Sequence, residues 1–163
     1  MPDYTDAILR TADDRTMLNA MLDVQRGELA ALVAGITESD ARRRLVPSLT
    51  TLLGLVKHGA FVEKVWFHHR VAGLSREELG IPEDVESSFR LSDRDTIESV
   101  AADFTGACRR SREIAADHPD LGAEFSRRTG VVTLRFIYTH MIQEYARHAG
   151  HGDILREQIA AQP

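Results

Sequence analysis

The chain has 163 residues, of which 43% are hydrophobic and 28% charged, the composition of an ordinary globular protein that can bury a core. Its net charge of −5 argues against nucleic acid as a partner, because phosphate binding needs a concentrated basic face. The N-terminus lacks the features of a signal peptide, and no apolar stretch approaches the roughly 20 residues that span a bilayer. We therefore expect a cytoplasmic protein that contacts neither nucleic acid nor membrane.

Apolar residues at spacings of three and four predict the first two helices. The first covers about residues 13–36, and Thr11 with Asp14 resembles a capping box at its start. After a polar connection, the second and most apolar helix covers residues 48–72, with Ser48 as its expected N-cap.

A long connection over residues 73–91 separates the second and third predicted helices and could cross over the end of the bundle. Ser92 and Asp95 form the clearest capping box in the chain and are expected to open the third helix, which stops at His118. The last helix is expected over residues 131–160, with a possible kink in its later part.

The predicted fold class is all-α, because no segment shows convincing strand alternation. We expect residues 1–163 to form a single domain, a four-helix bundle with a long crossover between helices 2 and 3. Cys108 is the only cysteine, so a disulfide framework is excluded, and its apolar register predicts inert packing. Phe61, Trp66 and Phe67 extend the apolar surface of the second helix, which leaves a homodimer open.

His58 occupies a position of the second helix where a leucine would be expected. Leu55, Val62 and Val65 surround it at helical spacing and make that face otherwise apolar. A lone histidine on an apolar face is most often a core residue bonded to a carbonyl, so His58 by itself does not indicate a ligand.

The inward seam of the last helix contains a carboxylate and two imidazoles in succession. A carboxylate is almost never buried without a partner, because desolvating its charge is costly. Glu144 and His148 are four residues apart and can reach one point beside the helix, although Glu144 could instead pair with Arg147 or an arginine of the first helix. The seam residues are Ile137, Met141, Glu144, His148, His151 and Leu155.

A divalent metal held by His58, Glu144 and His148 accounts for all three polar side chains together. Imidazole nitrogen and carboxylate oxygen suit zinc, nickel, iron(II) or manganese(II). Three protein ligands leave coordination positions open, which is the pattern of a catalytic site. His151, one turn further along, and Arg147 are the candidate catalytic residues beside the metal.

The remaining polar and aromatic side chains near these seams are expected to be less involved. His140 falls on a neighbouring face, while His68 and His69 end the second helix and are expected to be solvated. Tyr145 and Trp66 are weaker candidates for the edge of a pocket.

The segments LGLVKHGAFVEKVW and THMIQEYARHAGHGDILRE resemble the DinB/YfiT-like four-helix superfamily, and the resemblance covers essentially the whole chain. Its His, Glu, His variant, found in the metal-binding domain of mycothiol-dependent maleylpyruvate isomerase, maps onto His58, Glu144 and His148. The resemblance implies a divalent metal, often zinc, that binds a low-molecular-weight thiol such as mycothiol or bacillithiol. The thiol is then transferred to an electrophile or used to isomerise a substrate.

The sequence and the resemblance together predict a metal-dependent, thiol-using transferase that acts on small electrophiles, in detoxification or stress. Two alternatives stay open. One is a metal-assisted hydrolase, in which the metal activates a bound water. The other is a bundle without catalytic activity that sequesters a metal or small ligand, with His151 as a fourth ligand.

Overall fold

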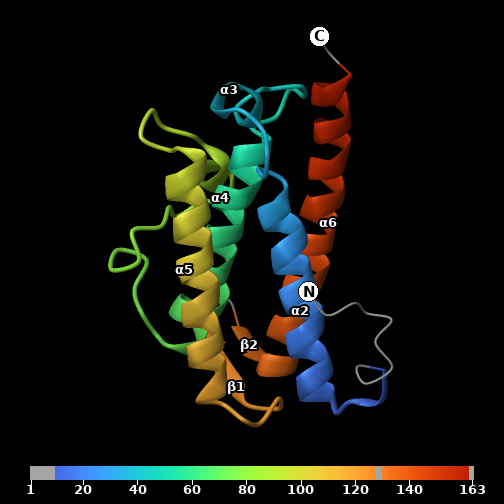
Figure 1. Ribbon diagram of the computed structural model, residues 1–163. Helices are drawn as coiled ribbons and strands as arrows, with labels where there is room; N and C mark the ends of the chain where they lie inside the picture. Colours follow the sequence, from blue (N-terminus) through green and yellow to red (C-terminus); the bar gives the residue numbers. More distant parts are fainter. Residues whose placement is uncertain (1–9, 128–129, 162–163) are drawn as a thin grey trace.

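Four long helices form the protein, as the computed structural model shows for residues 10–127 and 130–161 (Figure 1). Helix α2 packs against α6, α6 against α4 and α4 against α5, while α2 also contacts α4 and α5. The prediction of an all-α bundle is confirmed, and none of the described helices is long and apolar enough to cross a membrane. The four helices are α2 (Asp14–Ala31), α4 (Leu52–Glu63), α5 (Ile97–Ala116) and α6 (Leu134–Ala160).

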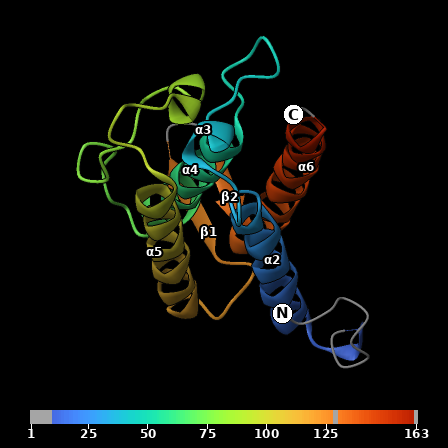
Figure 2. The same ribbon diagram turned by 45° about the horizontal axis from the view of Figure 1, so that its top comes forward.

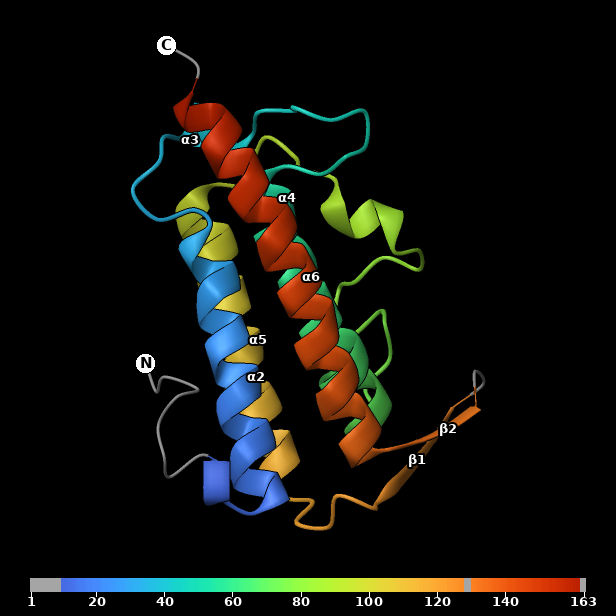
Figure 3. The same ribbon diagram turned by 90° about the vertical axis from the view of Figure 1, so that its right-hand side faces the viewer.

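The two middle helices of the chain, α4 and α5, run in the same direction (Figure 1). The connection between them returns along the outside of α4 before α5 begins (Figure 3). It includes the short 3-10 helix η2 (Glu86–Phe89), which packs against α4. A further short helix, α3 (Glu38–Ala41), lies at the end of the bundle that is turned forward in Figure 2. The long crossover is therefore as the sequence predicts.

The N-caps of α2, α4 and α5 are not the predicted residues Thr11, Ser48 and Ser92. The Ser92–Asp95 pair closes a turn just before α5, with Ser92 N donating to Asp95 Oδ2 at 2.6 Å. The same side-chain pattern satisfies the amides of a turn as well as those of a helix start, so sequence alone does not separate the two. The caps of α2, α4 and α5 are Asp13, Thr51 and Thr96, and Ser99 completes a capping box with Thr96.

A β-hairpin precedes α6, contrary to the expectation that the chain lacks strands. Strand β1 (Glu124–Arg127) pairs antiparallel with β2 (Gly130–Thr133), and α6 begins only after Thr133, whose side chain caps it. A two-stranded hairpin is marginal in isolation, but this one packs against neighbouring helical segments (Figure 3). Val131 therefore belongs to β2 and not to the last helix.

Helix α4 continues without a break into η1 (Lys64–Val71), a π-helical segment. Its hydrogen bonds span five residues instead of four, so side chains after Glu63 leave the register that the apolar spacing predicts. Val65 is accordingly half-buried, whereas Leu55 and Val62 are buried as expected.

The last helix runs through Gly150 and Gly152 to Ala160, so its end does not fray at the two glycines. A Cβ on Gly152 would collide with the side chain of Leu32, the residue that follows α2 as its C-cap. The glycine therefore permits close approach of α6 to α2.

Candidate metal centre

Helices α4 and α6 bring His58, Glu144 and His148 together inside the bundle. Glu144 Oε1 lies 3.3 Å from His58 Nε2 and 3.1 Å from His148 Nε2. One ligand atom from each residue lies within 4.8 Å of the others. His58 is only 2% exposed, whereas Glu144 and His148 are half-buried, so the cluster is reached from the α6 side. All three ligands predicted from the sequence therefore meet at one point.

The side chain of Ser88 orients the imidazole of His58. The Ser88 hydroxyl donates to the carbonyl of Val85, and the same oxygen lies 2.7 Å from His58 Nδ1. With the hydroxyl hydrogen directed at the Val85 carbonyl, Nδ1 carries a proton and donates it to Ser88. A neutral His58 then presents the lone pair of Nε2 to the Glu144 carboxylate.

Two features of the cluster fit a cation. His58 Nε2 and Glu144 Oε1 lie 3.3 Å apart, so either the imidazole is protonated and donates to the carboxylate, or a cation lies between the two groups. His148 Nδ1 is the buried side-chain nitrogen without a hydrogen-bond partner among the described residues. A divalent cation accepts lone pairs from two imidazoles and one carboxylate, so the residues present fit a metal.

The protonation states of the cluster also match those of a metal site. Hydrogen bonds from His148 and His58 hold the pKa of Glu144 well below its usual range. Burial lowers the pKa of His58, although Glu144 opposes this effect. An ionised carboxylate and a neutral imidazole are the forms that bind metal.

Aromatic rings from two segments cover His58. The Phe89 ring of η2 stacks on the imidazole with centroids 4.0 Å apart and an interplanar angle of 12°. Phe89 also contacts the edge of His148 at 5.7 Å, and Phe61 stacks on His58 at 5.9 Å. The long connection therefore supplies both the hydrogen bond that orients His58 and an apolar cover that limits water at the centre.

Of the two candidate catalytic residues, the structure places His151 beside the cluster. Its ring lies 5.8 Å from that of His148, and its side chain is exposed. Arg147 is also exposed, and its charge acts on His140. Burial lowers the pKa of His140, Glu144 opposes this effect, and Arg147 adds to it. His151 borders an open cavity of about 310 Å³, whose other lining residues are Val46, Ser48, Thr50, Ile154, Leu155 and Gln158.

The expectation that His68 is solvated is wrong. His68 is 5% exposed, and its Nε2 lies 3.1 Å from the carbonyl of Ala107 and 3.2 Å from Ser111 Oγ. It belongs to η1, where the π-helical register turns it toward α5. His140 lies against Trp66 with centroids 4.5 Å apart, so neither of these residues joins the three-residue cluster.

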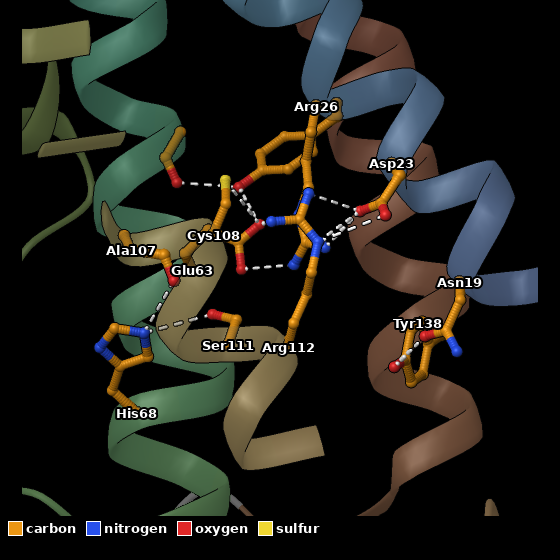
Figure 4. A network of polar contacts seen from close by, with 12 residues as sticks. Asn19, Asp23, Arg26, Glu63, His68, Ala107, Cys108, Ser111, Arg112 and Tyr138 are labelled. Atoms are coloured by element: carbon orange, nitrogen blue, oxygen red, sulfur yellow. Dashed lines mark hydrogen bonds and ion pairs between the residues drawn. The ribbon is translucent and has the colours of Figure 1, made fainter. Parts of the chain in front are cut away.

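Sequence reasoning missed a buried ion pair in the core, between Arg26 of α2 and Glu63 of α4 (Figure 4). Glu63 is completely buried, and its two carboxylate oxygens accept from Arg26 Nε at 2.7 Å and Nη2 at 2.9 Å. The Tyr145 hydroxyl lies 3.0 Å from Glu63 Oε1 and 2.9 Å from the carbonyl of Gly59. Tyr145 is therefore a buried residue beneath the centre and not the edge of a pocket.

The sequence did carry a signal for this pair. Glu63 continues the buried face of Val56, Gly59 and Phe67 at helical spacing, and Arg26 follows Leu22 in the same way on α2. Opposite charges on the apolar faces of two helices are the pattern to look for, because neither charge is stable in a core alone.

Cys108 lies beside the ion pair, with Sγ 3.6 Å from Glu63 Oε1. Burial, reinforced by the charge of Glu63, raises the pKa of the Cys108 thiol well above its usual range. The thiol therefore stays protonated and is not a nucleophile, in keeping with the inert packing expected from its register.

Comparison with known proteins gives one informative result. A family model described as mycothiol S-transferase matches residues 17–161, which include all four long helices but for the first turn of α2. A search of curated proteins gives no match to this chain.

Proposed function

The chain belongs to the mycothiol S-transferase family, and on this basis we propose that it transfers a low-molecular-weight thiol to a small electrophile with the help of a divalent metal. The observation that carries the metal dependence is the convergence of lone pairs from His58, Glu144 and His148. The family match also agrees with the DinB/YfiT-like resemblance in sequence. Zinc is the expected ion, because two imidazoles and a carboxylate form a donor set that it commonly accepts.

A bound divalent metal deprotonates a coordinating thiol and so supplies a nucleophile at neutral pH. The residues of this chain prepare the site for that chemistry. Ser88 holds His58 in the tautomer that offers Nε2 to the metal. Phe89 and Phe61 exclude water from one side and thereby strengthen the electrostatic interactions at the centre. His151, at the rim, is the group placed to hold or move a proton.

The cavity beside His151 is the proposed place for the reacting small molecules. Its lining combines apolar side chains such as Ile154 and Leu155 with hydroxyl and amide groups such as those of Thr50 and Gln158. A mixed lining of this kind accepts a small organic molecule and orients it through a few hydrogen bonds.

The metal is tested by elemental analysis of protein purified without a histidine tag. We expect near-stoichiometric zinc or another divalent metal in the wild type and its loss in His148→Ala. His140→Ala is the matched control, since it removes a histidine from the same helix outside the cluster and should leave the metal content unchanged. A wild-type protein that takes up no metal even after incubation with zinc would overturn the proposal.

Transfer is tested by following the loss of a chromogenic electrophile with and without mycothiol. We expect turnover only with thiol and only in metal-loaded protein, and its loss in His148→Ala but not in His140→Ala. Turnover without any thiol would instead identify a hydrolase and contradict the proposed reaction.

A further inference from the structure

A second cavity, of about 680 Å³, lies between η1, the connection that follows it and strand β1. The guanidinium groups of Arg70, Arg76 and Arg127 line it together with Trp66 and His69. The hairpin that contributes Arg127 is seen beside the end of the α4–η1 helix in Figure 3. We propose that this cavity binds a small dianion, with carboxylate or phosphate oxygens as the groups recognised.

The cavity concentrates positive charge in a protein whose net charge is −5. Three guanidinium groups come from three different segments, and Glu83 is the one carboxylate among the described residues of the lining. The Glu83 side chain is 87% exposed and lies 3.8 Å from Arg76 Nε, so it is a solvated partner at the rim.

Neutral carbonyl oxygens hold these guanidinium groups in place. Arg127 Nη2 donates to the carbonyl of His69 at 3.1 Å, and Arg76 Nη1 donates to that of Pro82 at 2.5 Å. A carbonyl orients a guanidinium without cancelling its charge. A guanidinium has five N–H donors, so Arg76 and Arg127 retain donors beside these bonds for a bidentate contact with a carboxylate or phosphate.

Arg70 shows that the positive charge is built into the fold and not merely exposed on it. Its side chain lies over the Trp66 ring at 5.4 Å, and the residue is only 7% exposed. Burial lowers the pKa of Arg70, and the nearby charge of Arg127 lowers it further. Two like charges held close together disfavour the fold slightly, and an anion between them removes this repulsion.

Trp66 is the only tryptophan of the chain and lines the cavity, so its fluorescence reports directly on binding. The test titrates untagged protein with inorganic phosphate and, separately, with malonate, at constant ionic strength set by sodium chloride. Calorimetric titration with the same two anions gives a second measurement that does not depend on the fluorophore. We expect saturable binding of at least one anion, and which of the two binds assigns the carboxylate or phosphate source.

Arg76→Gln and Arg127→Gln are expected to weaken that binding about tenfold each, since each removes a charge-assisted contact. Arg110→Gln is the matched control, because Arg110 is an exposed guanidinium on α5 paired with Glu113 and should leave the affinity unchanged. Binding should persist in His148→Ala, so failure of the metal proposal would leave this one standing. The absence of saturable binding by both methods, or equal affinity in Arg127→Gln and wild type, would overturn it.

Discussion

At the scale of single residues, Ser88 contacts His58 Nδ1 and so turns Nε2 of the same ring toward Glu144. Its hydroxyl accepts from Nδ1 and is itself held by the carbonyl of Val85. Partners of this kind orient metal-binding histidines, and their loss costs about 10- to 100-fold in metal affinity. We expect Ser88→Ala to weaken zinc binding about tenfold, measured by competition with a chromogenic chelator.

Ser87→Ala is the control for this effect. Ser87 is the preceding residue, and its hydroxyl bonds to Asp84 instead of to the centre. Its removal should leave zinc affinity within about twofold of wild type, the scale of a change that touches no ligand. Equal affinities in the Ser88 and Ser87 variants would show that the hydrogen bond does not position His58.

At the scale of helices, a hydrogen bond from Tyr145 links α6 to α4 beside Glu144 and His58. Its hydroxyl reaches the carbonyl of Gly59, which follows His58 in the chain, while Tyr145 itself follows Glu144. A net hydrogen bond contributes about 1 kcal/mol, which corresponds to roughly fivefold in a binding constant. We expect Tyr145→Phe to weaken metal binding by about that factor, measured with the same chelator.

Tyr138→Phe provides a matched comparison on the same helix. Tyr138 is also buried, and its hydroxyl donates to Asn19 of α2 at 2.6 Å. Both variants should lose a similar amount of stability to urea, but only Tyr145→Phe should lose metal affinity. If both variants lost metal affinity equally, the effect would reflect stability of the bundle and not the positioning of ligands.

At the scale of the whole molecule, the Arg26–Glu63 pair makes stability depend on pH. Burial by itself would raise the pKa of Glu63, but the charge and hydrogen bonds of Arg26 bring it below the usual range. The folded protein therefore binds this proton less readily than the unfolded chain does. The contribution of the pair is complete above the ordinary glutamate pKa of about 4.3. It is lost as the pH falls through the folded-state value.

We expect the melting temperature of the wild type to fall as the pH drops below about 4.3, where unfolded-state glutamates take up protons. Glu63→Gln should be destabilised by about 3–5 kcal/mol at neutral pH, because the Arg26 charge stays buried without its partner. The stability of this variant should fall less steeply with acid. Asp103→Asn, which breaks an exposed pair with Lys64, should cost less than about 1 kcal/mol. An unchanged acid slope in Glu63→Gln would contradict the assignment.

The sequence by itself determined the bundle, the long crossover and the residues that converge at the centre. Helical periodicity reveals which side chains share a face, and a histidine or glutamate on an apolar face stands out because it needs a partner there. His58, Glu144 and His148 are each recognisable in this way on their own helix. We predicted that the three residues meet because the apolar faces of both helices were expected to turn toward the same core.

Only the tertiary structure decided the remaining features, because they depend on contacts between segments far apart in the chain. The hydrogen bond from His58 to Ser88 spans 30 residues, and the pair of Arg26 with Glu63 spans 37. The hairpin is too short to be recognised by alternation, and it is stable because helices pack against it. The π-helical register of η1 likewise has no periodic signature, yet it buries His68 and helps to bring Arg70 and Arg127 around one cavity. The spacing of residues along the sequence predicts which face of a helix a side chain occupies. Only the packing of the helices determines which other segments that face contacts.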